Sequence, residues 1–310
     1  MNGNSIANRW RACFKEQSGS SLPLVGLMLV ALLALTGLVI DMGTLYVTKA
    51  HLQKTANAAV LSGAQELANS ESAVEQVIQH VLNKHDEGDS THTMSIEMER
   101  RVAMDLVKDV NLKFAQLLGI DRMPVEVHAA AAIEHIGRAA GAAPLGIDEA
   151  IPLEFNREYK LKVDQTEVEY GNFGVLALGG PGANTYEDNL RHGYANEIKV
   201  GDVIEAQTGN IAGKTRSAIR ERLDHCPYEP GEMHHRDCSR VLLIPVYKPH
   251  NHHSNQLKEV EITGFAYFYI TEPMSPQDTS ITGQFIKRTG TGFAEPGASG
   301  NGAYAIRLTE

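Results

Sequence analysis

The sequence predicts an α+β protein with a long N-terminal helix, a small α+β region and a β-rich C-terminal domain. Two observations lead to this fold class. An uncharged apolar run of nineteen residues, from Leu22 to Ile40, continues into an alanine-rich stretch with helical spacing and no proline. Beyond about residue 90, apolar residues either alternate with polar ones or form short continuous runs, which is typical of strands.

The apolar run Leu22–Ile40 has the length and composition of a transmembrane helix. At 1.5 Å per residue it extends about 28 Å, close to the roughly 30 Å hydrocarbon core of a bilayer. A buried helix of a soluble core would rarely be apolar on every face. A cleaved signal peptide is disfavoured for two reasons. The run is longer than the apolar region of a typical signal peptide, and no small-x-small cleavage site follows it.

Charges on the two sides of this run predict its orientation. Arg9, Arg11 and Lys15 precede it and Asp41 follows it. Basic residues are retained on the cytoplasmic side, so residues 1–21 are expected to form a cytoplasmic tail and residues 22–40 the single transmembrane segment. The remainder is expected outside the cell membrane, with an extracytoplasmic C-terminal region. Lys49 and Lys54 weaken this signal but do not reverse it.

The helix is expected to continue beyond the membrane to about Leu67, for a total of about 69 Å. Its sequence DMGTLYVTKAHLQKTANAAVLSGAQELA is dense in good helix formers. One stripe of mostly small residues recurs at helical spacing: Leu45, Leu52, Ala56, Ala59, Gly63 and Leu67. Small residues allow another helix to approach closely, so this stripe is predicted to serve helix association.

Residues 37–67 resemble the N-terminal domain of the TadG-like proteins of Flp-pilus assembly. The resemblance consists of an apolar helix followed by Asp-x-Gly, an aromatic residue, a basic residue, Leu-Gln and a run of small residues. It implies a membrane-anchored component of a Tad/Flp pilus or secretion system that contacts other Tad proteins or pilin-like subunits. The positions predicted to pack or assemble are Gly37, Asp41, Gly43, Tyr46, Leu52, Gln53, Ala56, Asn57, Ala59 and Gly63.

Three departures limit this resemblance. Members of the family often have Asp where this chain has Asn57. Class III prepilins have Glu five positions after their cleavage glycine, whereas Leu24 stands five positions after Gly19, so pilin-like processing is not implied. The Asp-x-Ser-x-Ser metal motif of longer TadG-like proteins does not occur, so metal-dependent adhesion is not implied either.

Residues 41–136 are expected to comprise the extracytoplasmic helix and a pilin-like α+β region. Ser72 and Glu75 form a capping-box pattern ahead of a short amphipathic helix. Alternation over residues 94–98 and 102–106 predicts a β hairpin, although the second segment would also tolerate helix. Val125 and Val127 open another strand, and the small, proline-bearing segment 137–150 is the expected linker.

Residues 151–310 are expected to form a β-rich domain, a small barrel or sandwich. Strands are predicted around residues 159–163, in RVLLIPVY, in VEITGFAYFYI with both faces covered, in ITGQFIKR and in AYAIRL. The segment SAIRERL is expected to be the only substantial helix of this domain.

Cys226 and Cys238 are expected to form a disulfide, because both lie on the exported side and Cys13 precedes the membrane segment. The alternative is a metal site, since the same region holds several histidines: His225, His234, His235, His250, His252 and His253. The spacing matches no established zinc motif.

The chain is expected to be non-enzymatic, without a cofactor or a bound metal. The segment TGNIAGKT fails as a phosphate-binding loop because Thr208 stands where glycine is required. The net charge is −10, and the basic tail leaves the remainder more acidic still, which disfavours nucleic acid. Two alternatives remain: an envelope-anchored module whose β domain binds a surface ligand, and a cell-surface enzyme of unrecognised type.

Overall fold

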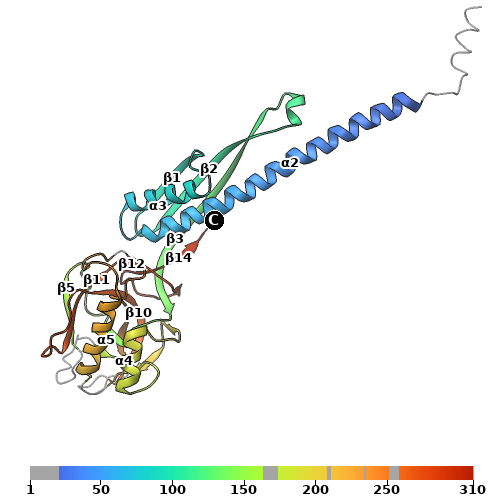
Figure 1. Ribbon diagram of the computed structural model, residues 1–310. Coiled ribbons are helices and arrows are strands. Elements are labelled where there is room, and N and C mark those ends of the chain that lie inside the picture. Colours follow the sequence, from blue (N-terminus) through green and yellow to red (C-terminus); the bar gives the residue numbers. More distant parts are fainter. Residues whose placement is uncertain (1–20, 163–173, 208–210, 234, 251–257, 310) are drawn as a thin grey trace, which may run out of the picture. The chain divides into compact units, whose positions relative to one another are not determined.

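The computed structural model describes residues 21–162, 174–207, 211–233, 235–250 and 258–309 (Figure 1). The chain divides into two compact units that interleave in sequence: residues 1–54 with 106–127, and residues 55–105 with 128–310. The elements are helical at the N-terminal end and mostly strands after residue 90, which confirms the predicted α+β class.

Helix α2 covers Ser21–Gly63 and is followed by one 3₁₀ turn, η1, over Ala64–Glu66. The predicted helical continuation to about Leu67 is therefore confirmed. Apolar side chains of residues 22–40 are exposed on every face, for example Leu22 at 80% and Leu32 at 65%. The run holds one polar side chain, Thr36, whose hydroxyl donates to the Leu32 carbonyl at 2.8 Å and so needs no water.

Helix α3 covers Glu71–Lys84 and begins at a different serine from the one predicted. Ser70, in extended conformation, accepts a hydrogen bond from the Ala73 amide with its side chain, so Ser70 is the N-cap. Ser72 lies within the first turn, and its hydroxyl accepts from the Gln76 side chain instead. The buried face of α3 consists of Val74, Ile78 and Leu82.

The first sheet has the strand order β1-β2-β3-β14-β12, and β7 and β13 pair with β3 in addition. The predicted hairpin is confirmed by β1 and β2, and alternate residues of β2 are buried. Strand β14 is antiparallel to β3, with Ile306 opposite Ile133. The bounds are β1 Thr91–Glu97, β2 Arg101–Asn111, β3 Arg122–Ala139, β7 Ile198–Lys199, β12 Arg288–Thr289, β13 Phe293–Ala294 and β14 Ala303–Leu308.

The second sheet has the order β5-β11-β10-β9-β4-β6, with β8 also paired to β10. Its centre is the antiparallel pair β9 and β10, and nearly every residue of β10 is buried, as expected for a strand covered on both faces. The bounds are β4 Leu145–Asp148, β5 Glu158–Lys162, β6 Gly174–Val175, β8 Val203–Glu205, β9 Val241–His250, β10 Glu259–Ile270 and β11 Ser280–Ile286.

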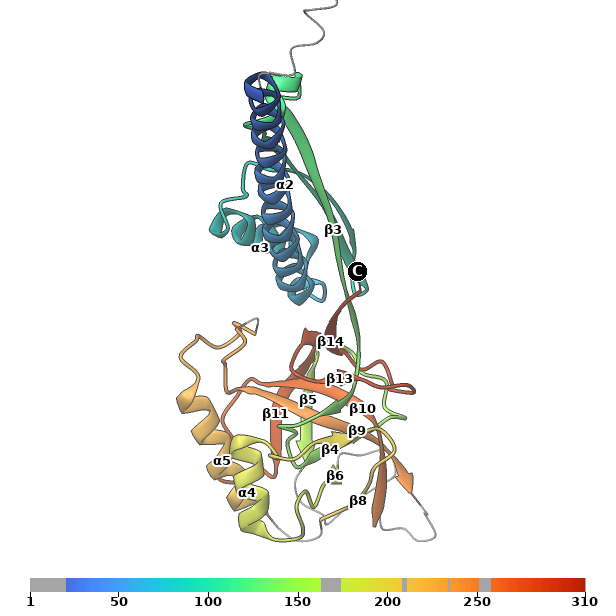
Figure 2. The ribbon, with the colours of Figure 1, turned by 90° about the vertical axis from the view of Figure 1, so that its right-hand side faces the viewer.

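Two helices, α4 (Ala183–His192) and α5 (Ala212–His225), lie together against the second sheet (Figure 2). The prediction of a single substantial helix was therefore wrong. Helix α4 was missed because its sequence is mainly polar and its buried face has only Tyr186, Asn189 and Leu190.

Parts of the segment expected to be a linker belong to strands: residues 137–139 end β3 in the first sheet, and residues 145–148 form β4 in the second. Ala142, Ala143 and Leu145 are buried, and β4 pairs in parallel with β9. The strand predicted in AYAIRL is β14, and it joins the first sheet. The proposed domain limits themselves stay predictions.

Candidate functional site

The carboxylate of Asp41 binds the start of a short 3₁₀ helix that lies far away in sequence. This helix, η2, covers Ala115–Leu118 between β2 and β3. Asp41 accepts from the backbone amides of Lys113 at 3.0 Å, Phe114 at 2.9 Å and Ala115 at 2.7 Å. Because a helix start leaves several amides without partners, a buried carboxylate there satisfies three donors at once.

Gly37 lies one turn before Asp41 and is in direct contact with the Phe114 ring. A Cβ atom at Gly37 would lie 2.6 Å from two atoms of that ring, a distance that leaves no space for a side chain. Together, Gly37 and Asp41 fix the turn between β2 and β3 against α2, and Figure 1 shows this turn beside the helix.

The other predicted positions near the membrane segment face outward. Gly43 has no atom within 4 Å of an added Cβ, and Tyr46 is 77% exposed. Tyr46 follows the end of the apolar run by six residues, where amphipathic aromatic side chains suit the bilayer interface. These two residues are available for contact with lipid or with another protein.

The small-residue stripe is packed inside the chain. Leu52, Ala56 and Ala59 are fully buried, and Gly63 is buried against α3. A Cβ at Gly63 would lie 2.7 Å from Ile78 Cγ1 and 3.4 Å from Val74 Cγ1. Gln53 and Asn57 are half-buried beside the stripe. The stripe thus serves helix packing within the monomer, and its use in association with other subunits stays a prediction.

The predicted disulfide between Cys226 and Cys238 is present, with a Cα–Cα distance of 4.8 Å. Cys226 is the C-cap of α5, and Cys238 lies three residues before β9, so the bond joins the end of a helix to the start of a central strand. The two thiols that a metal site would need are therefore already used.

Three histidines of the metal alternative are described by the structure: His225, His235 and His250. His235 stacks on Tyr228 with ring centroids 3.6 Å apart. His234, His252 and His253 lie outside the described residues. In the described part of the chain, no group of three His, Cys, Asp or Glu side chains is arranged to hold a metal ion.

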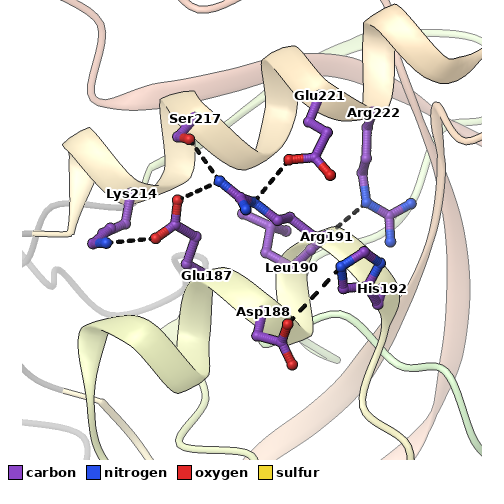
Figure 3. Close-up of polar contacts among 9 residues, drawn as sticks. All are labelled: Glu187, Asp188, Leu190, Arg191, His192, Lys214, Ser217, Glu221 and Arg222. Carbon is purple, nitrogen blue, oxygen red and sulfur yellow. Dashed lines mark hydrogen bonds and ion pairs between the residues drawn. The ribbon is translucent and has the colours of Figure 1, made fainter.

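Charged side chains join α4 to α5 (Figure 3). Glu187 accepts from Lys214 at 2.6 Å and from Arg191 at 2.7 Å, and Arg191 also reaches Glu221 and Ser217. The bond from Lys214 is the main reason that the pKa of the Glu187 carboxyl is lowered, and it outweighs the effect of burial. The network links the two helices through a carboxylate that is only 12% exposed.

Arg222 fixes the C-terminal end of α5, which the disulfide at Cys226 also fixes. Its guanidinium donates to the carbonyls of Leu190, Ser239 and Val241, and the Ser239 hydroxyl donates back to the Arg222 carbonyl. Burial lowers the pKa of Arg222 to about 10, so the side chain stays charged near neutral pH. These contacts bind helices and strands to each other.

Sequence reasoning missed Phe114 and the backbone amides that Asp41 binds. The amides belong to residues 72 to 74 positions away, and a backbone donor carries no side-chain signature. The one available signal was the pairing of an acidic residue with a glycine one turn earlier at the end of the apolar run. That pattern indicates that another segment of the chain approaches the helix closely at this point, but it does not indicate which segment.

Comparison with known proteins gave one match and two negative results. No curated protein and no solved structure matches the chain. The family described as "Putative Flp pilus-assembly TadE/G-like" matches residues 19–66, which include the whole of α2. This range also holds a helix that is long and apolar enough to cross a membrane, the one such helix among the described residues. Residues 19–66 of this chain thus match the Tad domain of the TadE/G-like pilus-assembly family, in agreement with the resemblance found in the sequence.

Proposed function

We propose that this chain is a membrane-anchored, non-enzymatic component of a bacterial Tad/Flp-type pilus assembly or secretion system, acting as an assembly factor or a minor pilin-like subunit. The observation that carries the proposal is the coincidence of the Tad match, residues 19–66, with the exposed apolar helix α2. A helix apolar on every face needs a nonaqueous environment, and a bilayer of roughly 30 Å suits its length.

In this proposal the N-terminus lies in the cytoplasm and the two sheets lie outside the cell membrane. The charge pattern around residues 22–40 supports the orientation, since three basic residues precede the run and Asp41 ends it. The Cys226–Cys238 disulfide agrees with it, because disulfides persist in oxidising compartments outside the cytoplasm.

A non-enzymatic role is supported by what the polar side chains of the described residues do. The buried or half-buried charges at Asp41, Glu187, Arg191 and Arg222 are engaged in fixing one element against another. Such groups stabilise the arrangement of the elements that they join. The partners in this proposal are the membrane and other Tad/Flp assembly proteins or pilin-like subunits.

Deletion of the gene should abolish or strongly reduce Flp pili in the source bacterium, and expression of the full chain should restore them. A variant in which residues 1–40 are replaced by a cleavable secretion signal should be exported but should not restore pili, because it lacks the anchor. Electron microscopy of negatively stained cells measures the result. Normal piliation of the deletion strain would contradict the proposal.

A further inference from the structure

The turn between β2 and β3 carries a group of exposed apolar side chains, which we call the tip cluster: Phe114, Leu117, Leu118, Ile120 and Met123. Leu117 and Leu118 are 82% and 77% exposed. Single exposed leucines are common on soluble proteins, but five large apolar side chains exposed within ten residues are typical of an interaction surface.

The place of the tip cluster along α2 is fixed by two contacts. Phe114 lies against Gly37, and the amides at the start of η2 bind Asp41. Gly37 precedes the end of the apolar run, Ile40, by three residues, which is about 5 Å along the helix axis. The tip cluster therefore lies beside the level at which α2 leaves the hydrocarbon core.

We propose that the tip cluster inserts into the outer leaflet of the membrane that α2 crosses. This inference rests on the proposed function, because it requires α2 to span that membrane. Apolar side chains held at this level would enter the boundary between headgroups and acyl chains, where interfacial segments are buried by about 5–10 Å. The bilayer thereby covers the apolar surface of η2 as well as that of α2.

The charges at the base of the turn suit this location. Lys113 precedes the tip cluster and Arg122 lies within it. Both are exposed, so they can reach the anionic headgroups of bacterial lipids. Asp121, also exposed, opposes this attraction in part. The tip cluster would act as a second anchor, and because Asp41 and Gly37 join it to α2, it would set the depth of the helix in the bilayer.

Fluorescence quenching of the full chain in vesicles tests this inference. The protein carries Cys13→Ser, keeps its disulfide, and bears an environment-sensitive dye on Leu118→Cys. The vesicles contain phosphatidylethanolamine, phosphatidylglycerol and a lipid spin-labelled near the headgroup end of its chain. The dye at residue 118 should lose fluorescence to the spin label and should be protected from iodide in the buffer.

Two other labelled positions separate this inference from the proposed anchoring. Leu33→Cys labels the apolar run, and Asp109→Cys labels an exposed site on β2, six residues before η2 begins. Quenching by lipid at residues 33 and 118 but not at 109 supports the inference. Quenching at residue 33 alone overturns it and leaves the anchor intact, whereas no quenching at residue 33 overturns both.

Discussion

Replacing Gly63 with leucine should lower markedly the temperature at which the folded part of the chain beyond the apolar run unfolds. Gly63 has ordinary helical dihedrals, so glycine is required there for lack of space. The Ile78 side chain fills the space that a larger side chain at position 63 would need, and Ile78 is itself fully buried. Overpacking of this kind costs about 3 kcal/mol. For a body of this size, that cost lowers the melting temperature by roughly 6 °C or more.

Gly43→Leu is the matched control, because Gly43 lies on the same helix with no atom within 4 Å of an added Cβ. Circular dichroism of the detergent-solubilised full chain measures both variants. A normal melting temperature for Gly63→Leu, together with loss of co-purifying Tad proteins, would show that the stripe serves association between subunits and not packing against α3.

Removing the disulfide should lower the free energy of unfolding by about 3 kcal/mol in the chain-entropy model, because the bond closes a short loop that is otherwise free in the unfolded chain. The variant is Cys226→Ser with Cys238→Ser, and Cys13→Ser is the control that leaves the bond intact. Because Arg222 still bonds Ser239 and Val241, loosening should concentrate in residues 226–238.

Hydrogen exchange measured by mass spectrometry locates this loosening, and the melting temperature gives its size. Reductant should reproduce the effect in the native chain. If a chelator destabilises the native chain and reductant does not, the metal alternative is right and the disulfide account fails.

Much of the fold follows from local sequence pattern. Helix α2 was predictable because its first half is apolar on every face and its second half has a stripe at helical spacing. The hairpin β1–β2 was predictable because alternating apolar and polar residues indicate a strand with one buried face. The central strands β9 and β10 were predictable because continuous apolar runs indicate a strand buried on both faces.

What the sequence did not reveal depends on partners far away in the chain. Strand β14 was expected, but its pairing with β3 is decided by tertiary packing. Helix α4 is stabilised by α5 through Glu187, Arg191 and Lys214 and has little apolar periodicity of its own. Asp41 was among the positions predicted to pack or assemble, yet its partners are backbone amides that no side-chain pattern encodes.

The most direct test of the account is the topology of the intact protein. The full chain, with an epitope tag after Glu310, is expressed in the source bacterium, and protease is added to spheroplasts with an unbroken cell membrane. The tag and the sheets should be digested, leaving a short membrane-protected fragment that contains α2 residues 22–40. Survival of the full tagged chain until detergent opens the membrane would contradict the claim that a single N-terminal helix anchors an exported body.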